Sequence, residues 1–125
     1  MEYISTRNSK KLFLFRDVFL KGLAPDGGLF VPRNLPKYSI RELNNLKNFS
    51  YAELAESIIF KFCNDEFNKK EIKEIIKSSY KNFRVKDVVA IKKVGKLNLL
   101  ELFHGPTLAF KDIAMQVIGN MYEKV

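Results

Sequence analysis

Apolar residues recur at the spacing of a helix face in several parts of the chain. After Ser50 they fall at intervals of three and four residues, which predicts an amphipathic helix with one buried face. The same spacing predicts helices over about residues 12–20 and 69–80. The face of the middle helix is the predicted core of the N-terminal part of the chain, and it consists of Leu54, Ala55, Ile58, Ile59, Phe62 and Cys63.

Polar residues and a glycine mark the predicted helix boundaries. Ser39, Ser50 and Asn68 are each followed three residues later by a glutamate. This arrangement is typical of a capping box, in which two side chains bond free N–H groups at a helix N-terminus. Gly22 follows the first apolar stretch and is the predicted end of the first helix.

Two apolar runs of strand length, residues 88–94 and 97–103, are separated only by Gly95 and Lys96. A two-residue connection between such runs predicts a β-hairpin. A further short strand is predicted over residues 1–4. Strands and helices together predict a mixed α/β chain.

Residues 25–28 have the sequence Pro-Asp-Gly-Gly, which is a strong turn signal. Proline presets φ, aspartate can bond back to the backbone, and glycine supplies a positive φ. Gly27 and Gly28 could also let backbone N–H groups approach a phosphate. No lysine followed by serine or threonine comes after them, so the segment is not a nucleotide-binding P-loop. The sequence favours a structural turn.

A second turn, at Gly105 and Pro106, follows the second predicted strand of the hairpin. Thr107 is the predicted N-cap of a final helix, which places Lys111 in its first turn. Partial positive charge at a helix N-terminus, together with apolar neighbours, would shift a lysine toward its neutral, nucleophilic form. Such a lysine suits condensation with an aldehyde, although a solvated surface lysine also fits the residues. The apolar face predicted for this helix consists of Phe110, Ile113, Ala114, Val117, Ile118, Met121 and Tyr122.

Two segments together are similar to segments of threonine synthases, which are fold-type II, tryptophan-synthase-β-like enzymes that use pyridoxal 5'-phosphate (PLP). Residues 103–107 are Phe-His-Gly-Pro-Thr and residues 110–112 are Phe-Lys-Asp, as in the family's cofactor-lysine segment. Residues 22–32 resemble a second family segment, with Phe30 where a tyrosine is usual. The start of the chain, Tyr3 to Arg7, also resembles the family, but Asn8 stands where glycine is usual and would have to accept the left-handed turn.

The resemblance implies roles for several residues. Lys111 would be the catalytic residue that binds PLP as an internal Schiff base. Candidate contacts for the substrate or its phosphate are His104, Thr107 and Arg7. The alternative for His104 is a hydrogen bond that holds the turn, and the alternative for Arg7 is an ordinary surface arginine. Structural turns are expected at Gly27, Gly28, Gly105 and Pro106, and no metal site is expected.

The resemblance also implies a reaction and a domain organisation. The substrate would be O-phospho-L-homoserine, and the products L-threonine and phosphate. Residues 1–95 would form the threonine synthase N-terminal domain, and residues 96–125 the start of an incomplete PLP-binding catalytic domain. Threonine synthases are several times longer than 125 residues. We therefore expect this truncated or split form to bind PLP poorly and to be inactive until a second chain completes the site.

Charge and composition add limits on partners and compartment. The formal net charge is +8, and seven of the basic residues lie between positions 77 and 96. Such a density could attract nucleic acid, but no RNA-binding signature accompanies it, so a solvated surface is favoured. The single cysteine, Cys63, excludes an intramolecular disulfide and belongs to an apolar stripe, which favours a packed, inert thiol. The sequence has no signal peptide and no membrane span, so the cytoplasm is expected.

Two alternatives to a threonine synthase remain open from the sequence. The first is a threonine-synthase-like phospho-lyase with the same lysine segment and a different substrate. The second is a non-catalytic remnant or binding module that uses the basic stretch. Because the catalytic domain is cut short, the final helix would expose an apolar face, so we expect instability or association when the chain stands alone.

Overall fold

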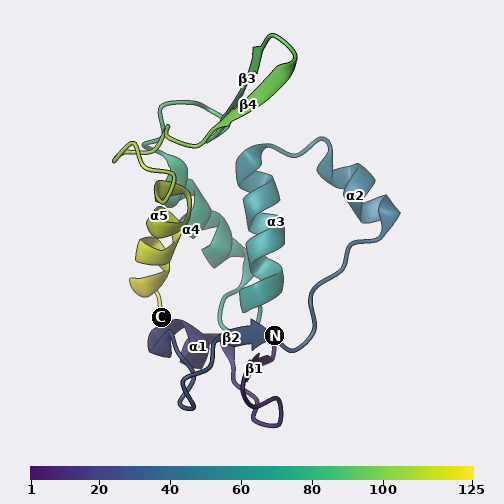
Figure 1. Ribbon diagram of the computed structural model, residues 1–125, viewed down its shortest axis with the longest axis vertical. Coiled ribbons are helices and arrows are strands. Elements are labelled where there is room, and N and C mark those ends of the chain that lie inside the picture. The colour runs from purple at the N-terminus through teal and green to yellow at the C-terminus, as the bar shows by residue number, and fades with distance from the viewer.

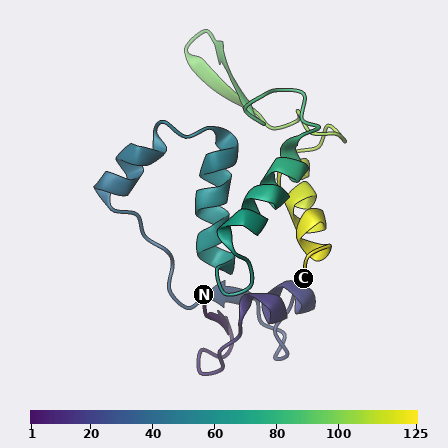
Figure 2. The same cartoon turned by 180° about the vertical axis from the view of Figure 1, so that it is seen from behind.

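Three helices lie side by side at the centre of the molecule, with α4 between α3 and α5 (Figures 1 and 2). The structure is a computed structural model that describes residues 1–125. In chain order the elements are β1 (Tyr3–Ser5), α1 (Phe15–Lys21), β2 (Phe30–Pro32), α2 (Ile40–Leu46), α3 (Tyr51–Cys63), α4 (Lys69–Tyr80), β3 (Ala90–Val94), β4 (Leu97–Glu101) and α5 (Asp112–Tyr122). None of these helices has the length and apolar character needed to cross a lipid bilayer.

The buried centre of the molecule is formed mainly by α4. Ile72, Ile75 and Ile76 of this helix are at most 2% exposed. They pack with four other buried residues, which are Cys63, Phe67, Val117 and Met121. The sequence predicted the core on the face of α3, but only Cys63 of that face is fully buried. The rest of the α3 face is half-buried or exposed because α4 covers only one side of it.

Capping boxes start all three helices for which the sequence predicted them. In α2, α3 and α4 the cap side chain accepts a backbone N–H bond, and the glutamate three residues later bonds back to the cap. The predicted limits of α4 are confirmed at both ends. Helix α1 begins at Phe15, later than predicted, because Phe13 pairs with Tyr3 in an antiparallel bridge.

Two small antiparallel sheets flank the helices. β1 pairs with β2 near the N-terminus, at one end of the molecule's long axis (Figure 1). β3 and β4 form the predicted hairpin, with Val94 paired to Leu97, and the hairpin projects from the other end (Figure 1). Gly95 in its turn has φ +60°, which glycine adopts without strain.

The predicted start of α5 was wrong. The helix begins at Asp112, and Thr107 does not cap it. Instead, Thr107 donates both of its hydrogens to the Asp112 carboxylate, and Leu108 has a left-handed φ of +62° that a helix cannot contain. Lys111 is consequently the last residue before the helix rather than part of its first turn.

Candidate functional site: the loop that carries Lys111

The segment between β4 and α5 is a succession of tight turns. The N–H of Leu108 donates to the carbonyl of Gly105 at 3.2 Å, and the N–H of Asp112 donates to that of Ala109 at 3.0 Å. The carbonyl of Lys111 then accepts the N–H groups of Ala114 and Met115, so it belongs to the first α5 bonds. The loop therefore places Lys111 immediately before the first residue of α5.

Asp112 fixes the geometry of this loop. Its carboxylate accepts the Thr107 N–H at 2.8 Å and the Thr107 hydroxyl at 2.9 Å, and the residue is 3% exposed. Burial raises the pKa of the Asp112 carboxyl, but hydrogen bonds to the carboxylate, those from Thr107 first, outweigh burial and lower the pKa overall. An ionised Asp112 thus holds the turn from inside.

Gly105 is buried directly against the Asp112 side chain. A Cβ atom at this position would lie 2.4 Å from both Cβ and Oδ2 of Asp112. Only glycine lets the two segments approach so closely. The predicted structural turn at Gly105 and Pro106 is therefore present, with Pro106 exposed beside it.

Lys111 itself is exposed and makes no ion pair. Phe110 and Leu108, the apolar neighbours expected to wall it, are 64% and 50% exposed. The amine is therefore accessible to a ligand in solution. What the fold supplies is the position of the lysine, through a loop that is tied at Thr107 and closed at Gly105.

His104 begins the same loop and lies within hydrogen-bond distance of Glu101, which forms an ion pair with Lys92; the sequence analysis identified neither contact. His104 Nε2 lies 2.8 Å from Glu101 Oε2, and Glu101 Oε1 lies 3.0 Å from Lys92 Nζ. The hydrogen bond from Lys92 is the main reason that the pKa of the Glu101 carboxyl is lowered. The carbonyl of His104 also accepts the Arg84 N–H at 2.9 Å. His104 is thus fixed by its side chain and by its backbone.

The sequence contained a signal for the ion pair between Lys92 and Glu101. In the predicted hairpin Val94 pairs with Leu97, which sets Ala90 opposite Glu101 and puts Lys92 diagonally next to Glu101 on the same face. The close contact from Glu101 to His104 has no such signal, since it depends on how the chain turns after β4.

Arg7 does not lie near the loop that carries Lys111. Its segment, between β1 and α1, is at the opposite end of the molecule from the loop before α5 (Figures 1 and 2). The guanidinium donates to the carbonyl of Asp26 at 3.1 Å, within the Pro-Asp-Gly-Gly turn. The structure brings His104, Thr107 and Lys111 into one loop but does not bring Arg7 to it.

The Pro-Asp-Gly-Gly turn has the predicted structural chemistry. Gly27 has φ +75°, and the Asp26 carboxylate accepts the Gly28 N–H at 2.9 Å and the Ser5 hydroxyl at 2.7 Å. A Cβ at Gly28 would lie 2.2 Å from the Ser5 hydroxyl oxygen. Asn8, the departure from the family pattern, does not have a positive φ, so no left-handed backbone is needed there.

The residues of the Lys111 loop fit one end of a PLP molecule. An accessible primary amine is the group that bonds the cofactor's aldehyde. The two nearby carboxylates are already engaged, Asp112 by Thr107 and Glu101 by Lys92 and His104. The loop therefore fits the covalent anchor, whereas the pyridine nitrogen would need a partner from outside it.

Comparison with known proteins identifies the family. Residues 2–80 match the family description "Threonine synthase N terminus". Threonine synthase of Schizosaccharomyces pombe is 39% identical over 98% of this chain, and that of Pseudomonas aeruginosa is 40% identical over 100%. These matches span 24% and 27% of the two relatives, so the chain spans about a quarter of their length.

Solved structures give the same result for the fold. PLP-bound threonine synthase from Brucella melitensis superposes with a TM-score of 0.91 at 37% identity, over 97% of this chain and 26% of that one. Yeast threonine synthase gives 0.90 at 40% identity, over 98% and 26%. The predicted class, a mixed α/β part of a fold-type II enzyme, is confirmed. The chain belongs to the threonine synthase family.

Proposed function

We propose that this chain supplies the cofactor-binding lysine of a threonine synthase, which converts O-phospho-L-homoserine and water into L-threonine and phosphate. The observation that carries the proposal is the placement of Lys111. It is exposed, free of ion pairs and set at the start of α5 by the bonds between Asp112 and Thr107. Similarity over the whole chain to threonine synthases supports the assignment of the reaction.

Lys111 has two tasks in this proposal. Its amine would hold PLP through the cofactor's aldehyde, and as a free amine it would move protons at Cα and Cβ of the substrate. When bound, PLP supplies an electron sink for the carbanion chemistry that phosphate elimination requires. His104 and Thr107 lie in the same loop. We assign the substrate phosphate to His104, through the ring nitrogen that Glu101 does not contact, whereas Thr107 holds the loop because its N–H and hydroxyl both donate to Asp112.

We assign a structural role to Arg7, because its guanidinium holds the turn at Asp26. We keep the division at residue 95, with residues 96–125 as the start of the catalytic domain and the cytoplasm as the compartment. Relatives are about four times as long as this chain, and their additional sequence is the source we propose for the remaining cofactor contacts. Catalysis then requires that additional portion, joined to this chain or supplied by a second one.

The test combines chemical trapping with activity. This chain is mixed with PLP, with and without the portion of Pseudomonas aeruginosa threonine synthase beyond its match, and is reduced with borohydride. Peptide mass spectrometry should place the added pyridoxyl mass on Lys111, far more completely when the second portion is present. Lys111→Arg should abolish both the labelling and threonine formation, whereas Lys96→Arg, at another exposed lysine, should leave both unchanged. Labelling spread over the surface lysines without enrichment at Lys111 contradicts the proposal.

A second candidate function is a related phospho-lyase. Threonine synthase-like 2 of Xenopus laevis is 36% identical over 98% of this chain, close to the value for the synthases. Assay of the completed enzyme separates the two, because only a threonine synthase releases threonine from O-phospho-L-homoserine. A completed enzyme that releases phosphate without forming threonine would favour the phospho-lyase.

A further inference from the structure

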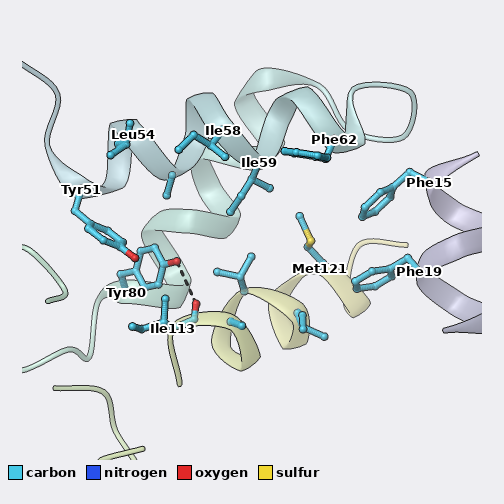
Figure 3. A pocket seen from close by; sticks show the side chains of 14 residues that line it. Phe15, Phe19, Tyr51, Leu54, Ile58, Ile59, Phe62, Tyr80, Ile113 and Met121 are labelled. Carbon is cyan, nitrogen blue, oxygen red and sulfur yellow. Dashed lines mark hydrogen bonds between the residues drawn. The ribbon is translucent and has the colours of Figure 1, made fainter. Parts of the chain in front are cut away.

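An open apolar groove of about 550 Å³ runs between α3 and α5, with aromatic side chains of α1 at one end (Figure 3). All of the residues that line it are hydrophobic. The α3 wall consists of Tyr51, Leu54, Ala55, Ile58, Ile59 and Phe62, and all of these except Tyr51 belong to the stripe that the sequence predicted to be core. The spacing of these residues predicts a buried helix face, but in this structure the face is open to solvent.

The opposite wall belongs to α5. Ile113, Val117, Ile118 and Met121 line it, and Phe15 and Phe19 close the end near α1 (Figure 3). The other end is closed by Tyr51 and Tyr80, whose rings meet edge to face at 5.5 Å. Tyr80 donates its hydroxyl hydrogen to the Ile113 carbonyl at 3.2 Å, so its polar group is already satisfied.

The chemistry of the groove selects its occupant. Water inside it finds few hydrogen-bond partners, because the walls are almost entirely apolar, so an apolar occupant is favoured. Two facing helices leave room for a third that lies along them and inserts side chains at intervals of three and four residues. The α3 stripe runs from Tyr51 to Phe62, about 16 Å of helix axis, which corresponds to roughly three helical turns.

We propose that this groove is the docking surface for an apolar helix face from the catalytic portion of a threonine synthase, meaning the sequence that the relatives have in addition to this segment. The relatives devote about three-quarters of their length to that portion, which is ample sequence to supply a covering helix. The first α5 residue that lines the groove is Ile113, two positions after Lys111. A helix seated there therefore adjoins the loop that needs further cofactor contacts, and the inference rests on the function proposed above.

A second copy of this chain is the other candidate occupant, and the charge disfavours it. Each chain has a formal net charge of +8, so two copies repel one another. A catalytic portion brings its own charge and the missing part of the site. Docking in the groove then fixes the position of α5, and therefore of Lys111, relative to the rest of the enzyme.

The experiment measures docking without PLP, so that it is independent of the lysine chemistry. The full chain is titrated calorimetrically with the portion of Pseudomonas aeruginosa threonine synthase beyond its match, whose folding is checked by circular dichroism. We expect a 1:1 complex in which hydrogen exchange slows along α3 and α5. Ile58→Glu, at a groove residue 39% exposed, should weaken binding by about tenfold or more.

Two comparisons make the result specific. Ala114→Glu on the opposite wall should weaken binding as Ile58→Glu does, whereas Ile40→Glu on α2, at a residue 79% exposed outside the groove, should bind like the wild type. Circular dichroism must show an unchanged fold for each variant. Lys111→Arg should dock normally while losing PLP labelling, which separates failure of docking from failure of the proposed function.

Three results would overturn the inference. The first is undiminished binding by Ile58→Glu, and the second is a wild-type chain that does not bind the folded partner portion. The third is a homodimer of this chain that Ile58→Glu dissociates, which would assign the groove to a second copy instead.

Discussion

The carboxylate of Asp112 accepts two hydrogen bonds from Thr107, one from the backbone N–H at 2.8 Å and one from the hydroxyl at 2.9 Å. These bonds close a five-residue loop whose last member is Lys111. A threonine that would otherwise cap the helix is used to tie the loop to the helix instead. The position of Lys111 is therefore set by the side chain of Asp112, a residue that is only 3% exposed.

Asp112→Asn should destabilise the chain at neutral pH but much less in acid. The folded-state pKa of Asp112 is lowered, so its ionised form stabilises the fold at a pH above the unfolded value of about 3.9. This contribution is lost as the pH falls through the folded pKa. Urea unfolding at pH 7 and at about pH 3 measures the difference, and a gap between wild type and Asp112→Asn that is equal at both values contradicts the role of the charge.

Gly105→Ala should destabilise the chain by roughly 1–3 kcal/mol, since the new methyl group would lie 2.4 Å from the Asp112 side chain. Gly119→Ala is the matched control. Gly119 lies inside α5 and a Cβ there meets nothing within 4 Å, so the same change should stabilise the helix by about 0.5–1 kcal/mol. Thermal or urea unfolding of the two variants should shift in opposite directions, and a Gly105→Ala variant that is as stable as the wild type or more stable would show that Gly105 is not sterically required.

Local signals in the sequence predict the elements whose determinants are local. The limits of α4 follow from the Asn68 capping box and the spacing of its isoleucines, and the β3–β4 hairpin follows from Gly95-Lys96. Family resemblance located Lys111 without any structure. These features depend on residues a few positions apart, which is why a single sequence contains them.

Contacts between distant residues were not predictable in the same way. Thr107 has the residue type of an N-cap, whose hydroxyl oxygen would accept a helix N–H. Instead, its hydroxyl and backbone N–H donate to the carboxylate of Asp112, five residues further on, and Leu108 adopts a left-handed φ. The apolar stripe of α3 has the spacing of a buried helix face, but this spacing does not indicate which element packs against the stripe. Burial on α4 rather than α3 depends on the packing of α5, which is formed by residues 32 or more positions beyond the last residue of α4.

Cys63 should be nearly unreactive in the folded chain. It is 0% exposed, and burial, helped by the charge of Asp65, raises the pKa of its thiol to about 12. At pH 8 the thiolate fraction is then about a thousandfold below that of an ordinary cysteine. Ellman's reagent should label the single thiol slowly in buffer and within minutes in strong denaturant. Fast labelling of the folded chain would mean that the core around α4 opens readily.

The position of the core can be measured with two isoleucines. Ile76→Ala, at a residue 0% exposed, should cost about 2–5 kcal/mol through lost burial and a residual cavity. Ile58→Ala, at a residue 39% exposed in the groove, should cost at most about 1 kcal/mol, because less apolar area leaves the solvent on folding.

Urea unfolding of the isolated chain gives both values. If the two changes lower the free energy of unfolding equally, the face of α3 is as much a part of the core as α4, as the sequence pattern alone predicts. If the groove is a docking surface, the cost of Ile58→Ala should rise once the catalytic portion is bound, since the side chain then becomes fully buried. The cost of Ile76→Ala should not change, because α4 already buries that side chain in the free chain.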